Sequence, residues 1–259
     1  MKALFTFLSI NLVICAQSTL APPKVGFVQD GRSSVHAVVG LAGNFLTGPT
    51  VSTGAVAAAY SGSLGLIKTD AQLIVTDANG QAIANTNAPG GRALFGFAAG
   101  GHAALAYFEA TGALVIWNGR AFQSVPLDAA TLAGSMVVSI AFEDSNLAAF
   151  VVERQDALWK VDVRTDTGAV VSQTALPGVT APALLVASGD LVYANARGMV
   201  VRKADGVEKQ VAAHLPKNFA LEQMGDGWVE VRDLASGRLY ALCVQSGHEA
   251  YYTLPEVRQ

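Results

Sequence analysis

The chain has 259 residues and a mass of 26.8 kDa, which suffices for one large domain. Hydrophobic residues make up 51% of the sequence and charged residues only 14%, so the chain has ample apolar surface for a core and long disordered stretches are excluded. The formal net charge of −3 excludes the strongly basic surface that binds nucleic acids or anionic lipids.

The first residues have the layout of a secretory signal peptide. Lys2 precedes an apolar run from Ala3 to Ile14, and Ala16 provides a small residue for cleavage. We therefore expect a signal peptide at residues 1–16, with cleavage as late as residue 21 as the alternative, and a periplasmic or secreted mature protein. The residues before Cys15 also resemble a lipoprotein box, so a lipid anchor at Cys15 is a weaker alternative. No later apolar run reaches membrane length.

Cleavage after Ala16 would leave Cys243 as the single cysteine, without a partner for an internal disulfide. Cys243 lies inside the apolar run Leu239–Val244. A buried, unreactive thiol is the usual state of a cysteine in such a run.

After the leader, two short runs flank Gly31-Arg32 and predict a hairpin, from Val25 to Asp30 and from Ser34 to Gly40. Five longer units follow, and each contains four runs of strand length separated by turns rich in glycine, asparagine and aspartate. The units span Thr53–Pro89, Ala93–Leu127, Met136–Pro177, Ala183–Pro216 and Phe219–Pro255. Between the second and third units, Asp128–Gly134 forms an insert that we expect to contain one helical turn.

Six of the nine prolines recur at intervals of about forty residues. Because proline lacks the amide donor of a sheet ladder, it belongs at the end of an outer strand or in the connection beyond it. Four strands per forty residues is typical of a propeller blade. The six prolines are Pro49, Pro89, Pro126, Pro177, Pro216 and Pro255.

This pattern resembles that of a β-propeller. We expect an all-β fold with about six four-stranded blades, five being the alternative, in a single domain over residues 24–259. The hairpin would be a reduced sixth blade, or would close the ring with the C-terminal unit. A stacked sandwich is the remaining alternative. The stretch Val25–Gly40 is also similar to the start of secreted propeller-like bacterial proteins of an uncharacterised type, a resemblance that implies no function.

The first strand of each unit is the least polar, which predicts that these strands lie innermost, where they are buried on both faces. Last strands such as Val207–Val211 carry more charge and suit an outer edge. One polar pair, Glu222 and Gln223, breaks the apolar pattern of the inner strands. Glu222 is therefore a candidate for the lining of a central channel.

No motif for catalysis, metal binding or cofactor binding is present in the sequence. The four histidines fall in four different units, and in the zinc-like start His248-Glu249 the second histidine is replaced by Tyr252. We expect no catalytic residue, no metal site and no cofactor. The three tryptophans, Trp117, Trp159 and Trp228, lie in or beside strands, where packing is their usual role.

These observations favour a secreted, monomeric, non-enzymatic scaffold that binds a protein or a glycan, with no role for nucleic acid. The expected binding face is formed by the connections between units and the turns between second and third strands, which share one end of a propeller. Alternatives are a propeller hydrolase or lyase with a loop-built site, and a structural subunit of an envelope assembly. The charged residues of the expected face are Asp70, Arg92, Asp128, Asp156, Arg197 and Lys217.

Overall fold

The structure is a computed structural model that describes residues 22–128, 131–144 and 146–256. The expected signal peptide and Cys15 lie outside the described residues. The described residues form 23 β-strands in six antiparallel sheets. In these same ranges, no helix is long and apolar enough to cross a membrane.

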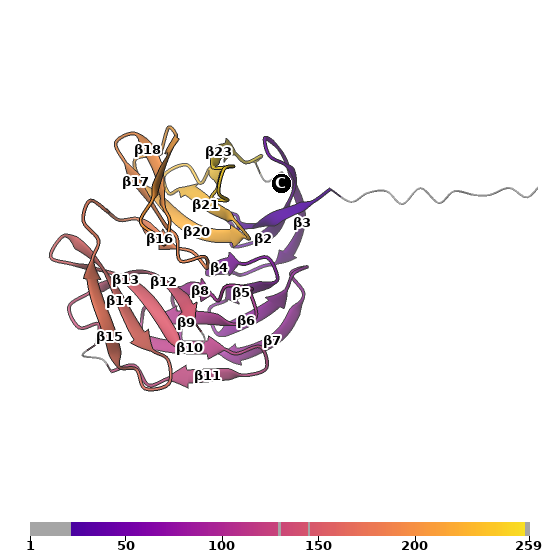
Figure 1. Ribbon diagram of the computed structural model, residues 1–259. Helices are drawn as coiled ribbons and strands as arrows, with labels where there is room; N and C mark the ends of the chain where they lie inside the picture. Colours follow the sequence, from indigo (N-terminus) through magenta and orange to yellow (C-terminus); the bar gives the residue numbers. More distant parts are fainter. Residues whose placement is uncertain (1–21, 129–130, 145, 257–259) are drawn as a thin grey trace, which may run out of the picture.

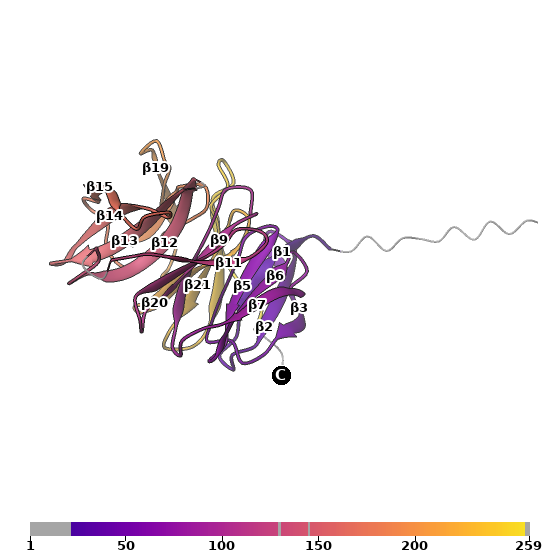
Figure 2. The same ribbon diagram turned by 90° about the horizontal axis from the view of Figure 1, so that it is seen from below.

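The six sheets are arranged as blades around a common axis, which confirms the propeller (Figure 1, Figure 2). Five blades have four strands and one has three, and each blade is an antiparallel meander of consecutive strands. Blade 1 contains β1 (Lys24–Gln29), β2 (Val35–Leu41) and β3 (Asn44–Ser52); blade 2 contains β4 (Ala57–Tyr60), β5 (Leu64–Lys68), β6 (Gln72–Asp77) and β7 (Ala82–Asn87); blade 3 contains β8 (Ala93–Phe97), β9 (Ala104–Phe108), β10 (Ala113–Trp117) and β11 (Phe122–Val125). Blade 4 contains β12 (Met136–Asp144), β13 (Leu147–Arg154), β14 (Ala157–Arg164) and β15 (Val170–Ala175); blade 5 contains β16 (Ala183–Leu185), β17 (Leu191–Asn195), β18 (Gly198–Arg202) and β19 (Glu208–Ala212); blade 6 contains β20 (Phe219–Gly225), β21 (Trp228–Asp233), β22 (Leu239–Cys243) and β23 (Ala250–Thr253).

The first strand of each four-stranded blade lies innermost and contacts the inner strands of other blades, as the sequence predicted. Small residues allow this convergence. In β8, a Cβ atom at Gly96 would lie 2.6 Å from the carbonyl oxygen of Ile140 in β12, so only glycine fits. The core fills the spaces between successive blades with side chains such as Phe97, Phe150 and Val229, all fully buried.

Blade 1 has three strands within the described residues, and the position it leaves empty is the innermost one. The amide of Ala55, just before β4, donates to the carbonyl of Ser33 in the β1–β2 turn, at 2.8 Å. At the other end of β1, Gly26 packs against the backbone of Met224 at the end of β20. Strand β1 therefore runs opposite to β4 and β20, as the second strand of a blade does. In consequence β4 and β20 contact each other directly.

The hairpin predicted for residues 25–40 is only part of blade 1, because a third strand, β3, follows it. Gly48 and Pro49 interrupt the apolar alternation that marks a strand, so β3 was not predicted. Pro49, expected at the end of an outer strand or in the connection beyond it, lies within β3 at the outer edge of the blade, where no ladder donor is needed.

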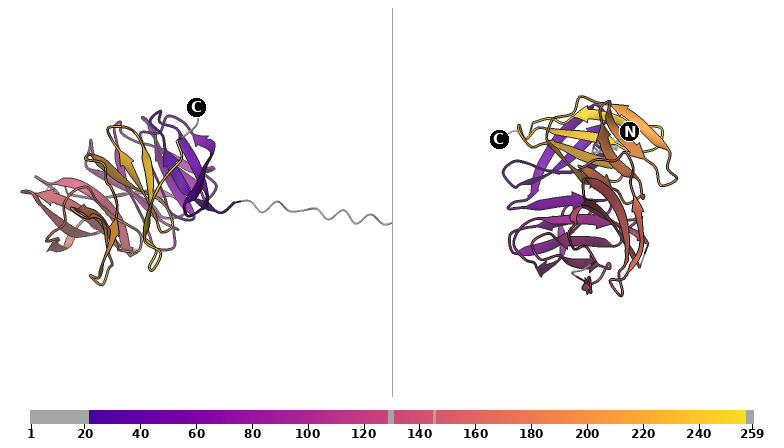
Figure 3. Two further views of the ribbon diagram at one scale, coloured as in Figure 1. Left: turned by 90° about the horizontal axis from the view of Figure 1, so that it is seen from above. Right: turned by 90° about the vertical axis from the view of Figure 1, so that its left-hand side faces the viewer.

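Of the two predicted roles for this segment, the structure supports the reduced blade. Blade 6 is built from β20–β23, and within the described ranges no N-terminal strand joins it. The ring closes where the first and last blades pack side by side (Figure 3). The helical turn expected in the insert before blade 4 falls partly on undescribed residues, and its described part, 131–134, is turn structure.

Candidate functional site

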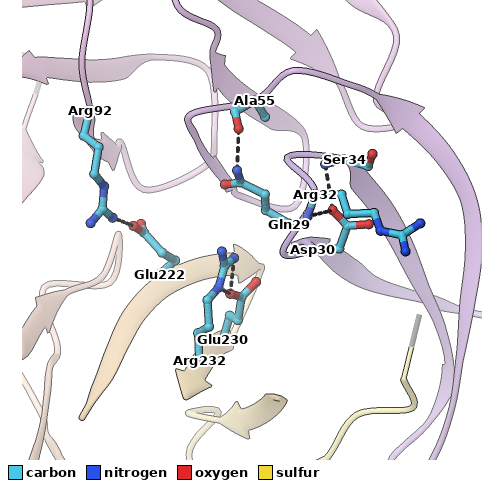
Figure 4. A network of polar contacts seen from close by, with 9 residues as sticks. All are labelled: Gln29, Asp30, Arg32, Ser34, Ala55, Arg92, Glu222, Glu230 and Arg232. Carbon is cyan, nitrogen blue, oxygen red and sulfur yellow. Dashed lines mark hydrogen bonds and ion pairs between the residues drawn. The ribbon is translucent and has the colours of Figure 1, made fainter. Parts of the chain in front are cut away.

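Two glutamates on adjacent strands form the polar centre of the ring. Glu222 on β20 and Glu230 on β21 lie directly opposite each other in the antiparallel register. Each carboxylate is paired with its own arginine (Figure 4). Arg92 Nη2 lies 3.3 Å from Glu222 Oε1, and Glu230 Oε1 accepts from Arg232 Nε at 2.7 Å and from Arg232 Nη2 at 2.5 Å.

The pair of Arg92 and Glu222 joins two blades that are not neighbours. Arg92 lies just before β8 and belongs to the connection that enters blade 3, whereas Glu222 lies on β20 of blade 6. Because blade 1 has no innermost strand, β4 alone stands between β20 and β8 on that side of the axis. The Glu222 side chain is 18% exposed and the Arg92 side chain 53%. The guanidinium thus covers a carboxylate that would otherwise face the axis alone.

Both glutamates have raised pKa values. Burial is the main cause of the pKa of about 7 for Glu222; attraction to Arg92 opposes the shift and repulsion from Glu230 adds to it. Burial also raises the pKa of Glu230, against the opposing effects of Arg232 and of a hydrogen bond from the backbone amide of Gln29. Glu222 is therefore a group that changes its charge near neutral pH.

Gln29 extends this network to the seam where blade 1 lacks an inner strand. Its backbone amide donates to Glu230 in blade 6, and its side-chain Nε2 donates to the carbonyl of Ala55 at 2.5 Å (Figure 4). Ala55 leads into blade 2. One residue of blade 1 thus links both neighbouring blades, and polar contacts partly replace a strand ladder.

The six charged residues predicted for the binding face are all exposed, and all lie in connections of the expected kinds. Because every blade is an antiparallel meander, these connections lie at one end of the ring, which we call the connection face. The residues are spread from blade 2 to the start of blade 6 and form no compact cluster. Of the six, Arg92 is the one that the structure joins to the predicted channel residue Glu222.

A buried lysine, which was not predicted from the sequence, supports one of these connections. Lys68, at the end of β5, is completely buried, and its Nζ donates to the carbonyl oxygens of Thr69 and Asp70. Burial lowers the pKa of Lys68, and the nearby charge of Asp70 opposes this. The signal available in the sequence was a lysine that closes the otherwise apolar run Leu64–Lys68.

The connection face also holds a cleft of 720 Å³ at the seam between blades 6 and 1. His36 lies in its wall, with Nε2 at 3.1 Å from Asp30 Oδ2 and Nδ1 at 3.4 Å from Thr50 Oγ1. Burial alone would raise the pKa of Asp30, but the backbone amides of Ser34 and Arg32, together with His36, hold it below its ordinary value. From the sequence, His36 was interpreted as an isolated histidine, because its partners come from a separate turn and strand.

No group of three or more potential metal ligands occurs in the part of the chain that the structure describes. Of the predicted packing residues, Trp117 and Cys243 are buried. Trp228 is half-buried and lines two cavities on the opposite end of the ring.

A ring of six antiparallel sheets with converging inner strands defines the protein as a six-bladed β-propeller. The chain matches no protein-family profile and no curated protein sequence. It is similar to a chain in the crystal structure of the nidogen/laminin complex, with a TM-score of 0.58, 10% identity, and coverage of 90% of this chain and 93% of that one. It is also similar to TolB from Acinetobacter baumannii, with a TM-score of 0.55, 12% identity, and coverage of 88% of this chain and 65% of that one. At these identities the likeness shows the fold alone.

Proposed function

We propose that this protein is a non-enzymatic propeller scaffold that binds a protein partner through its connection face. The main support is the ion pair between Arg92 and Glu222, which holds a charged side chain from a connection of that face over the inner strands. The face thus presents polar groups close to the axis as well as at its rim. Exposed charges of both signs around it suit a protein surface, where complementary charges give specificity and orientation.

The similar fold in the nidogen/laminin structure belongs to a complex of two proteins, which is consistent with a propeller acting as a binding module. The mixed charge of the connection face is the reason why we propose a protein partner and not a polyanion. A surface that carries Arg197 and Lys217 together with Asp70 and Asp156 has no single sign to attract a polyanion.

The test uses two arginines in matching turns on opposite ends of the ring. The amide of Arg197 donates to Asn195 Oδ1 at 2.8 Å, and the amide of Arg120 donates to Asn118 Oδ1 at 3.0 Å. Arg197 lies on the connection face, in the β17–β18 turn, and Arg120 lies at the other end, in the β10–β11 turn. A partner is first identified by affinity capture and mass spectrometry, and then purified for calorimetry.

We expect Arg197→Glu to weaken partner binding about tenfold or more and Arg120→Glu to leave it unchanged. Equal effects, or an effect of Arg120→Glu alone, would place the interface elsewhere. Loss of binding from substitutions at Glu208 and Lys209 on the outer strand β19 would instead favour the envelope-assembly alternative.

We also propose that the protein is exported and cleaved after Ala16, on the strength of Lys2 and the apolar run that follows. Mass spectrometry of the mature protein is expected to give an N-terminus at Gln17. A retained Met1 or an acylated Cys15 would contradict this proposal.

A hydrolase is the second candidate function, and one observation favours it. Thr50, His36 and Asp30 form a hydroxyl–imidazole–carboxylate chain in the wall of the 720 Å³ cleft, an arrangement that activates a hydroxyl nucleophile in other enzymes. Hydrolysis of p-nitrophenyl esters that is lost in both Thr50→Val and His36→Gln would support it. Absence of activity, or activity that survives both changes, would contradict the hydrolase. The contacts among Thr50, His36 and Asp30 would then have only a structural role.

A further inference from the structure

Two cavities at the end of the ring opposite the connection face adjoin the same tryptophan. We call this end the turn face, since it is formed by the turns between first and second and between third and fourth strands. The smaller cavity, 240 Å³, lies between blades 5 and 6, and the larger, 530 Å³, lies on blade 6 between Lys209 of blade 5 and Ala42 of blade 1. Trp228 and Gln245 line both, so the indole and the amide form a shared wall.

The indole of Trp228 is held by two other rings. Its centroid lies 5.6 Å from Phe45 at an interplanar angle of 86° and 6.1 Å from Tyr252 at 45°. Phe45 is buried and comes from β3, the strand of blade 1 that was not predicted. Trp228 is half-buried, and its Nε1–H donates to no atom of the described residues. A ring fixed in this way offers a ligand an apolar surface and one free donor.

Polar groups surround this ring without being used by the fold. A Cβ atom at Gly227 would lie 2.4 Å from Gln245 Cγ, so the glycine lets the Gln245 side chain lie over the turn beside Trp228. The side chains of Gln245, Asp226 and His248 are exposed and make no hydrogen bond within the described ranges. Donors and acceptors are therefore both available at the edges of the two cavities.

The charges of the cavities have both signs. Lys209 and Glu249 line the larger one, and the smaller contains the ion pair between Lys203 Nζ and Asp190 Oδ2, at 3.0 Å. A ligand of high net charge gains little from such a lining, because attraction to one group is offset by repulsion from the next. An uncharged polyol matches it better, since each hydroxyl both donates and accepts.

We propose that the two cavities beside Trp228 form one binding site for a neutral oligosaccharide. The apolar C–H face of a sugar ring packs on the indole, and its hydroxyls bond to Gln245, Asp226 and Glu249. Two adjoining cavities accommodate successive sugar units on either side of the tryptophan. This site lies on the turn face and is independent of the protein-binding surface proposed above.

The experiment titrates the protein with neutral hexose and N-acetylhexosamine oligosaccharides of increasing length, monitored by tryptophan fluorescence and calorimetry. We expect at least one oligosaccharide to bind and to change the emission. Trp228→Phe should abolish the emission change while the other two tryptophans remain, and Gln245→Ala should weaken binding about tenfold. Because Gln245 is exposed, its substitution leaves folding intact even if Trp228→Phe does not.

Arg197→Glu on the connection face is the matched control and should bind the oligosaccharide as the unaltered protein does. Failure of every neutral oligosaccharide to bind at millimolar concentration overturns the proposal. Binding that survives both Trp228→Phe and Gln245→Ala overturns the site, and binding confined to sulfated or otherwise charged sugars overturns the ligand class.

Discussion

At the scale of single residues, Glu222 is the side chain most sensitive to its surroundings. It is held at the axis between one arginine that stabilises its charge and a second glutamate that opposes it. Burial outweighs the arginine, so the folded protein retains a proton that the unfolded chain releases at lower pH. The ion pair with Arg92 therefore forms fully only above neutral pH.

This difference makes the stability of the protein depend on pH. The pKa of Glu222 rises from an ordinary value of 4.5 to about 7 on folding, so the folded state binds more protons between these values. The contribution of Glu222 to the free energy of unfolding should therefore be highest below pH 4.5. This contribution falls as the pH rises through 7, by up to about 3 kcal/mol.

Urea denaturation at pH 5 and pH 8 checks this prediction. Glu222→Gln, which stays neutral, should lose the decline and be the more stable protein at pH 8. Parallel pH profiles for the two proteins would show that Glu222 does not titrate in this range.

Closure of the ring depends on a glycine, Gly26, where β1 contacts β20. A Cβ atom there would lie 1.9 Å from the carbonyl oxygen of Met224, whereas a Cβ at Gly31 would meet nothing within 4 Å. We predict that Gly26→Ala destabilises the protein by about 3 kcal/mol or more, because backbone must move, and that Gly31→Ala changes stability by less than about 0.5 kcal/mol. Thermal unfolding of both variants is the measurement; similar melting temperatures would refute the close contact between β1 and β20.

At the scale of elements, blade 1 has three strands and docks between two complete neighbours. Gln29 joins it to both of them, and Phe27 stacks on Tyr60 of blade 2 with ring centroids 4.2 Å apart. The blade thus contributes packing on both sides although it lacks the position nearest the axis.

Deletion of residues 22–52 tests the importance of blade 1. Without it, the core side chains of β20, β21 and β4 at the seam would be exposed, as would their free backbone groups. We expect the shortened chain to aggregate, or to melt well below the full-length protein in light-scattering and calorimetric measurements. A monomer with unchanged melting temperature would show that the ring closes without this blade.

The sequence was sufficient to predict the strands with strong periodicity. It was insufficient to predict how blade 1 packs between blades 6 and 2. The five later units were predicted within a few residues because their strands are apolar runs bounded by pairs such as Asn118-Gly119. Strand β3 was missed because Gly48 and Pro49 obscure its alternation. The direction of β1, the exposure of Trp228 and the bridge from Arg92 to Glu222 depend on contacts between distant residues, and no local pattern encodes them.

At the scale of the whole molecule, the propeller ring closes with blades 2 and 6 in contact across the reduced blade 1. Gly62, in the β4–β5 turn of blade 2, lies beside Asp226 of blade 6: a Cβ at Gly62 would be 3.0 Å from the Cβ of Asp226. The Cβ atoms of two cysteines at these positions would need to move apart only slightly to reach the separation of about 3.8 Å between Cβ atoms in a disulfide. A complete four-stranded blade between them would hold these turns apart.

The most direct measurement is therefore disulfide formation in a chain that begins at Gln17 and carries Cys243→Ala, Gly62→Cys and Asp226→Cys. We predict complete oxidation, read by thiol titration and mass spectrometry, with no loss of melting temperature. The matched control pairs Gly62→Cys with Thr167→Cys in the outer β14–β15 turn of blade 4, on the same end of the ring, and should remain reduced. Failure of the first pair to oxidise in the folded protein, or equal oxidation of the control, would contradict this closure of the ring.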